Sequence, residues 1–253
     1  MKFSACIEWL FADEAPVFAD RIRAAKDAEL DGVEFWRWTD KDLDAIEVAL
    51  RETGLPLVGI VAEPMIPLTD PARHAEFLAG LDNSIATARR LGAPVLIAQT
   101  GNLLETPRAD QLRALVDSLK RAADRLAGTG VVLAIEPLNT RVDHVGYFLS
   151  STAEGLDIVD EIGRPEIRIV YDIYHAAVMD EAIAPILEGR LDDVAHVHLA
   201  DRPGRGEPGN GSLDWRARLA WLAQAGWDGF VGLEYRPSRA TRETLAFRDT
   251  LAA

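Results

Sequence analysis

The sequence contains a single cysteine, Cys6, so no disulfide bond can form within the chain. Cys6 lies in an apolar run, where a buried and unreactive thiol is expected. A chain without disulfides suits a reducing compartment. Its 253 residues are enough to bury a large core without a disulfide or a structural metal.

Long apolar runs are also missing from the sequence. No segment approaches the ~20 apolar residues that a membrane-spanning helix needs. The amino-terminal segment MKFSACIEWLF has only a short apolar stretch, which Glu8 interrupts, unlike a secretory signal. We therefore expect a cytoplasmic protein.

Positive charge is scarce along the chain. Lysine and arginine total 27 residues against 41 aspartates and glutamates, so the net charge is −14. Such a chain repels nucleic-acid phosphates and anionic membranes, and no basic stripe offsets this field. We expect no nucleic-acid partner and no membrane partner. A small anionic substrate would need local positive charge from a metal ion or an arginine.

Short apolar runs alternate with longer segments of helical periodicity along the whole chain. Runs such as VVLAI and FVGL are apolar at consecutive positions, which is typical of strands covered on both faces. The eight predicted strands are residues 2–7, 32–35, 57–61, 95–98, 131–135, 167–171, 195–199 and 230–233. Eight helical segments accompany them, such as the amphipathic stretch ADQLRALVDSLKRAADRLA.

Eight repeats of a strand followed by a helix predict a closed (β/α)8 barrel, the TIM barrel. The chain length is usual for one such domain, and no linker or low-complexity segment divides it. We therefore predict an α/β fold with a single domain over residues 1–253. An open, doubly wound sheet is the structural alternative.

Four consecutive predicted strands each carry, at or near their end, a side chain that can bind a metal. These are Glu136, Asp172, His198 and Glu234. In (β/α)8 barrels the carboxyl ends of the strands form one rim, and the active site lies there. An ionised carboxylate beside an apolar strand is unfavourable unless it is paired or coordinated. The four residues therefore predict one metal site at this rim.

The predicted ligand set of three carboxylates and one imidazole is rich in oxygen. Such a set favours a hard divalent ion, Mn²⁺, Mg²⁺ or Co²⁺, over copper or an iron–sulfur cluster, with zinc as a further option. We expect one divalent ion as the cofactor.

Other residues near the same rim are candidates for binding the substrate. Arg205 lies in the Gly/Pro-rich segment PGRGEPGNG and could clamp a substrate carboxylate, the alternative being an exposed or ion-paired arginine. Glu63 and Gln99 come at the ends of the third and fourth strands and could contact substrate hydroxyls. Glu207 is expected to pair with a neighbouring arginine.

Apolar and histidine side chains near the rim have structural explanations as well. Residues 9–11 (WLF) could form an apolar wall that excludes water from the site, or pack under a loop. His196 points the same way as His198 but one layer deeper, where a supporting or core role is expected. His74 and His144 fit no pattern and are expected at the surface.

Several segments in the second half of the chain resemble the hydroxypyruvate isomerase family of the xylose-isomerase-like barrels. They are IEPLNTR, YDIYH, HVHLADRPGRGEPGNG and GLEYRP, of which ADRPGRGEP is the most specific. The resemblance implies that the four rim residues bind one divalent ion and that Glu136 and Glu234 form the acid/base pair. It also implies that His175 contacts a substrate hydroxyl or carbonyl. Dimers or tetramers are frequent among relatives, so a homo-oligomer is a further expectation.

One position departs from the family pattern, which usually has glutamine where this chain has His198. Histidine there is typical of the related ketose 3-epimerases. The expected reaction interconverts hydroxypyruvate and tartronate semialdehyde through an ene-diolate, with a ketose 3-epimerase or a 2-oxo-tetronate isomerase as alternatives. A non-catalytic sugar-binding barrel would be expected to lose some of the ligands. An abasic-site endonuclease of the same fold would need three metals and a basic groove.

Overall fold

The computed structural model describes residues 1–251 of the chain, in which eight parallel strands close into a barrel. The strands are β1 (Lys2–Cys6), β2 (Gly32–Phe35), β3 (Leu57–Val61), β4 (Val95–Ala98), β5 (Val132–Ile135), β6 (Ile167–Asp172), β7 (Val194–Leu199) and β8 (Phe230–Leu233). Each strand pairs with the next in sequence, and β8 pairs with β1. This closure confirms the predicted barrel and excludes the open sheet, which would leave two edge strands.

The predicted strand bounds agree closely with the structure. Four of the eight strands have the predicted bounds, and each of the others differs by one residue at one end. The difference in β6 has a local cause at Asp172. This residue ends the strand and also caps the following helix, where its Oδ1 accepts a hydrogen bond from the His175 backbone N–H at 2.8 Å.

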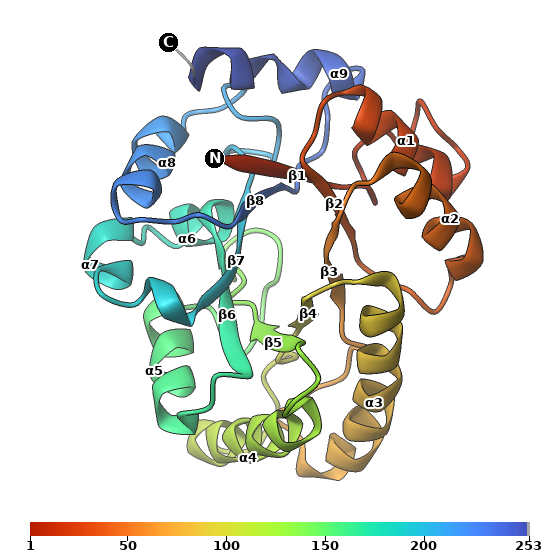
Figure 1. The fold of residues 1–253 in the computed structure, drawn as a ribbon. Helices are drawn as coiled ribbons and strands as arrows, with labels where there is room; N and C mark the ends of the chain where they lie inside the picture. Colours follow the sequence, from red (N-terminus) through yellow and green to blue (C-terminus); the bar gives the residue numbers. More distant parts are fainter. Residues whose placement is uncertain (252–253) are drawn as a thin grey trace.

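Helices form a ring outside the strands in chain order, and the last helix lies beside the first (Figure 1). Those within residues 1–251 are α1 (Phe18–Asp27), α2 (Leu43–Thr53), α3 (His74–Leu91), α4 (Arg108–Leu126), α5 (Thr152–Ile162), α6 (Ile173–Val178), α7 (Ile183–Leu187), α8 (Trp215–Gln224) and α9 (Thr241–Thr244). They exceed the eight predicted segments because the link between β6 and β7 holds both α6 and α7. None of these helices is both long and apolar enough to cross a membrane.

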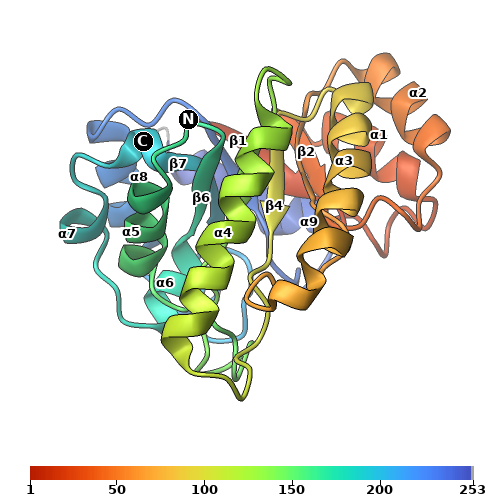
Figure 2. The same cartoon turned by 90° about the horizontal axis from the view of Figure 1, so that it is seen from below.

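The long helix α4 shows how the pattern of apolar residues places a helix on the barrel. Its buried residues include Leu115, Leu119 and Leu126, which recur at helical spacing and therefore share one face. Figure 2 shows α3 and α4 side by side along the barrel wall. Arg125 and Asp82 form an ion pair of 2.7 Å between these two helices.

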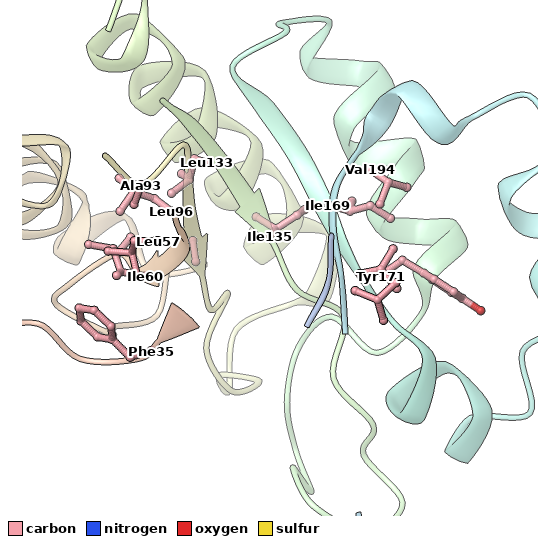
Figure 3. Close-up of a cluster of buried hydrophobic side chains, with 14 of the residues drawn as sticks. Phe35, Leu57, Ile60, Ala93, Leu96, Leu133, Ile135, Ile169, Tyr171 and Val194 are labelled. Atoms are coloured by element: carbon pink, nitrogen blue, oxygen red, sulfur yellow. The ribbon is translucent and has the colours of Figure 1, made fainter. Parts of the chain in front are cut away.

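Most strand residues are apolar on both faces of the sheet, which explains the continuous apolar runs. One face packs against the helices and belongs to the main core, where Leu133, Ile135 and Ile169 lie (Figure 3). The alternate residues point into the barrel and form a second, smaller cluster that includes Ala134 and Val170. Because side chains alternate along a strand, the residues two positions after each inner one face the same way, one layer closer to the rim.

Candidate active site and metal centre

The four predicted metal ligands meet at the carboxyl-terminal rim of the barrel. Glu136, Asp172, His198 and Glu234 are all buried, and each offers one ligand atom within 4.8 Å of the others. The Nδ1 atom of His198 lies 3.0 Å from Glu136 Oε1, 3.5 Å from Glu234 Oε2 and 4.0 Å from Asp172 Oδ2. The register supports this arrangement, since His198 pairs with Asp172 on one side and with Gly232 on the other.

The electrostatics of this cluster fit a bound cation. Burial raises the pKa of Glu136, and the nearby Glu234 and Asp172 raise it further against the opposing effect of His198. Burial alone would lower the pKa of His198, but Glu234, Glu34 and Glu136 together raise it well above its ordinary value. Three carboxylates this close and this deeply buried need positive charge. The oxygen-rich set fits a hard divalent ion held by these residues.

Arg205 supplies positive charge to the same cluster. Its guanidinium forms an ion pair with Glu234 Oε2 and lies 3.7 Å from Asp172 Oδ2. It also lies over the Trp9 ring, 5.1 Å from the ring centroid. The side chain is buried, and the carboxylates Glu234 and Asp172 raise its pKa although burial opposes this. The structure thus brings the predicted substrate-binding arginine directly over the ligands.

A tightly bonded loop holds Arg205 in this position. The buried carboxylate of Asp201 accepts backbone hydrogen bonds from Gly209 at 2.8 Å, Gly211 at 3.1 Å and Leu213 at 2.9 Å. A Cβ at Gly211 would lie 2.6 Å from Asp201 Oδ1, so this close approach requires glycine. The loop also contacts the segment that follows β8, because the Arg236 backbone N–H donates to the Arg205 carbonyl at 2.8 Å.

His175 lies beside the ligands as a neutral hydrogen-bond donor. Its Nδ1 accepts the backbone N–H of Asn139 at 3.1 Å, which places the ring proton on Nε2. That Nε2 is buried, 3.7 Å from Asp172 Oδ2, and has no hydrogen-bond partner among the described residues. Burial, followed by the charge of Arg205, lowers the pKa of His175 well below its ordinary value. The N–H is therefore available to a ligand in the cavity.

A cavity of about 350 Å³ opens above the four ligands. Besides the ligands Glu136, His198 and Glu234, its lining residues include Cys6, Trp9, Trp36, Arg37, Gln99, His144, His175, Arg205 and Arg236. The predicted contacts Gln99, His175 and Arg205 are among them. The buried thiol of Cys6 lies 4.0 Å from Glu234 Oε1, and burial raises its pKa, as expected for an unreactive cysteine.

Two tryptophans belong to the apolar part of the cavity wall. Trp9 and Trp36 pack edge to face, with their ring centroids 4.9 Å apart. Trp36 Nε1 donates a hydrogen bond to Glu234 Oε1 at 2.6 Å, a contact that the analysis of strand ends missed. Its position directly after β2 was the available signal. The predicted wall is therefore only partly right, since Leu10 and Phe11 lie in the main core instead.

The structure does not bring Glu63 to the cavity. Its carboxylate accepts hydrogen bonds from the backbone N–H groups of Trp38 at 2.9 Å and Thr39 at 3.0 Å. The side chain also lies 3.2 Å from Arg37 Nε. Glu63 thus holds the loop after β2, and it is absent from the cavity lining.

Three predictions for residues around the site were wrong. Glu207 accepts hydrogen bonds from the backbone and hydroxyl of Ser238 and has no arginine partner among the described residues. His74 is buried, with its Nε2 3.0 Å from the Leu68 carbonyl oxygen. His144 is half-buried and lines the cavity rather than the outer surface. For Glu207 the cause is its contact with Ser238, 31 residues away in the sequence, which no local pattern shows.

A buried acidic residue inside the barrel also escaped prediction. Glu34 lies within β2, and its Oε2 is 2.6 Å from His196 Nε2 while its Oε1 is 3.3 Å from His198 Nε2. Burial alone would raise the pKa of Glu34, but the two histidines lower it well below its ordinary value. A glutamate in the otherwise apolar strand GVEF was the signal. His196 has the deeper, supporting position that was expected.

The chain is similar to proteins of one family over nearly its whole length. Residues 22–251 match the family described as Xylose isomerase-like TIM barrel. A putative hydroxypyruvate isomerase of Mus musculus is 33% identical, over 98% of this chain and 94% of that protein. Hydroxypyruvate isomerase of Escherichia coli is 30% identical, over 98% of each chain.

A solved structure has the same fold over nearly the whole chain. A crystal structure described as AP endonuclease, family 2, from Brucella melitensis superposes with a TM-score of 0.92 at 30% identity, covering 98% of each chain. The curated relatives named here are isomerases, and so is this protein. The chain belongs to the xylose isomerase-like TIM barrel family, and within it to the hydroxypyruvate isomerase family.

Proposed function

We propose that this protein is a divalent-metal-dependent isomerase that interconverts hydroxypyruvate and tartronate semialdehyde. The observation that carries the proposal is the convergence of Glu136, Asp172, His198 and Glu234 below a cavity that arginines line. These four residues would hold the ion, which when bound supplies a Lewis acid for negative charge on the substrate oxygens.

The two glutamates suit the proton transfers of this reaction. One removes a proton from C3 of hydroxypyruvate, which leaves an ene-diolate, and a proton is then returned to C2. Glu136 follows β5 and Glu234 follows β8, so they approach a bound substrate from different sides of the barrel. The hydroxyl proton moves from the C3 oxygen to the C2 oxygen, so no atom is gained or lost.

Neighbouring side chains assist this transfer. The free Nε2–H of His175 can donate a hydrogen bond to the oxygen on which negative charge develops. Trp9 and Trp36 shield the cavity beside Glu234 from water, which protects the ene-diolate. Trp36 also fixes Glu234 through its 2.6 Å hydrogen bond.

The distribution of positive charge favours a substrate with a carboxylate over a neutral ketose. Arg205 is paired with Glu234, and Arg37 lies 3.2 Å from Glu63. Arg236 lines the cavity and lies over the Trp9 ring at 5.1 Å, and it has no carboxylate partner within residues 1–251. Its guanidinium is therefore available to bind the carboxylate of a keto acid.

A small substrate also agrees better with the site than nucleic acid does. The net charge of −14 repels a phosphodiester backbone. Within the described residues, the only other group of potential metal ligands, Glu34 with His196 and His198, shares His198 with the first. Ligand groups for the three metals that an abasic-site endonuclease would need are not formed by these residues.

Deuterium exchange tests the proposed reaction directly. The Mn²⁺-loaded protein is incubated in D₂O with hydroxypyruvate and, separately, with ketohexoses, then quenched and freed of Mn²⁺ for NMR. Deuterium incorporation with formation of tartronate semialdehyde is expected. Exchange at C3 of a ketohexose with hydroxypyruvate untouched would overturn the proposal and assign the protein to the ketose 3-epimerases.

A further inference from the structure

Glu34 is an acidic side chain buried inside the barrel, below the four ligands. It belongs to β2, which contributes none of those ligands, and it is only 3% exposed. Burying a carboxylate is unfavourable unless it has charged or hydrogen-bonding partners. Its partners all come from other strands: Ser4 Oγ donates to Oε2 at 3.3 Å, and His196 and His198 approach both oxygens.

The two nitrogens of His198 face different carboxylates. Nδ1 points to the cluster of Glu136, Asp172 and Glu234, while Nε2 lies 3.3 Å from Glu34 Oε1. A histidine binds a metal through a nitrogen that carries no proton, so Nδ1 can bind only if the ring proton is on Nε2. Glu34 Oε1 makes no hydrogen bond within the described residues and is the carboxylate oxygen beside Nε2, so its negative charge favours a proton on that nitrogen.

The surrounding strands are shaped to admit this acceptor. A Cβ at Gly232 would lie 2.6 Å from His196 Nε2 and 2.8 Å from His198 Cδ2, and closer still to Glu34 Oε1. Only glycine leaves room for the group at this position of β8. The rings of His196 and His198 pack at 88°, with centroids 4.8 Å apart, so His196 supports the ring as well as Glu34.

We propose that Glu34, held by His196, is a positioning residue that keeps the His198 proton on Nε2 and so directs Nδ1 to the metal. The inference rests on the metal centre of the proposed function but not on the identity of the substrate. Glu34 also lines the cavity, but its nearest partners are His196, His198 and Ser4, so it acts on the metal centre through His198.

Metal affinity in a charge-removing variant tests this role. The metal-free wild-type protein and Glu34→Gln are titrated with MnCl₂ and followed by calorimetry. Supporting carboxylates of this kind are worth roughly 10–100-fold in affinity, so the dissociation constant of Glu34→Gln should rise by about that factor. Glu181→Gln is the matched control, because Glu181 is partly buried and bonds to Ser151 and Thr152 away from the cavity.

A measurement on the wild-type protein keeps the test decisive if the variant fails to fold. Long-range ¹H–¹⁵N spectra of ¹⁵N-histidine-labelled, Mg²⁺-loaded protein report which ring nitrogen carries the proton, with His198→Gln identifying the signal. A proton on Nε2 of His198 is expected. A proton on Nδ1 would overturn the proposal.

The titration also separates this inference from the proposed function. A wild-type protein that binds no Mn²⁺ would overturn the proposed metal centre. Normal Mn²⁺ binding by Glu34→Gln would overturn the positioning role alone. Two ions per chain in the wild type, reduced to one in Glu34→Gln, would instead make Glu34, His196 and His198 a second metal site and would also overturn the positioning role.

Discussion

Gly232→Ala adds one methyl group inside the barrel, directly beside the supporting group of the site. The new Cβ would lie 2.6 Å from His196 Nε2 and 2.8 Å from His198 Cδ2. His196, His198 and Glu34 are all buried, and each already lies in close contact with the Gly232 position. The substitution must therefore displace at least one of them.

Both stability and metal affinity should fall in Gly232→Ala. Overpacking a filled core costs about 1–3 kcal/mol, and a chain of this size loses about 2–4 °C in Tm per kcal/mol, so the expected drop is about 2–12 °C. Displacing the support of His198 should also weaken Mn²⁺ binding by roughly 10-fold or more.

Calorimetric Tm values of the metal-free proteins and a Mn²⁺ titration measure the two effects. Gly59→Ala is the matched control, because a Cβ there meets only Val95, at 3.5 Å or more, which is ordinary contact. An alanine in a strand without a clash is stabilising by about 0.5–1 kcal/mol, so the control should keep or raise its Tm. A Gly232→Ala protein with the Tm and Mn²⁺ affinity of Gly59→Ala would refute this account of the site.

Three further predictions concern the reaction and its pH dependence. Glu234→Gln should reduce kcat by about 10²–10⁴-fold with an unchanged circular dichroism spectrum, and normal turnover would exclude Glu234 as acid or base. Arg236→Gln should raise KM for hydroxypyruvate by about 10-fold with little change in kcat, whereas an unchanged KM would remove Arg236 from carboxylate binding. The pKa of His198 is raised above its ordinary value of 6.5, so its contribution to stability is present below that pH and is lost as the pH rises through the folded value. The Tm of the metal-free protein should therefore fall as the pH is raised above 6.5, and His198→Gln should flatten this fall; an equally steep fall in that variant would contradict the assignment.

The barrel could be predicted because its two layers leave separate marks on the sequence. The strands are buried on both faces, so they appear as short continuous apolar runs, and the helices show a single apolar stripe. The sequence did not predict that the link between β6 and β7 holds two helices. The break between α6 and α7 comes from local hydrogen bonding around Met179 and Glu181, which leaves no mark on the apolar pattern.

The metal ligands could also be predicted from the strand pattern. The residues that support these ligands, such as Glu34, could not. Asp172 and His198 lie in strands whose ends share one rim, so position along the chain determines their meeting. The histidine partners of Glu34 come from β7, far away in sequence, and only the closed barrel brings them together. Arg236 likewise depends on its stacking against Trp9, a contact between the two ends of the chain.

Gln99 and Glu63 show how far beyond the end of a strand its position still predicts a side chain that points into the barrel. Side chains alternate only while the backbone stays extended, so a residue directly after a strand keeps the alternation of that strand. Gln99 and Glu136 directly follow β4 and β5, and both line the cavity. Glu63 has the same parity as the inward-facing Val61, but it lies two residues beyond the end of β3 and bonds to the loop after β2 instead. Glu63 has therefore lost the inward direction of its strand, whereas Gln99 and Glu136, the first residues after theirs, have kept it.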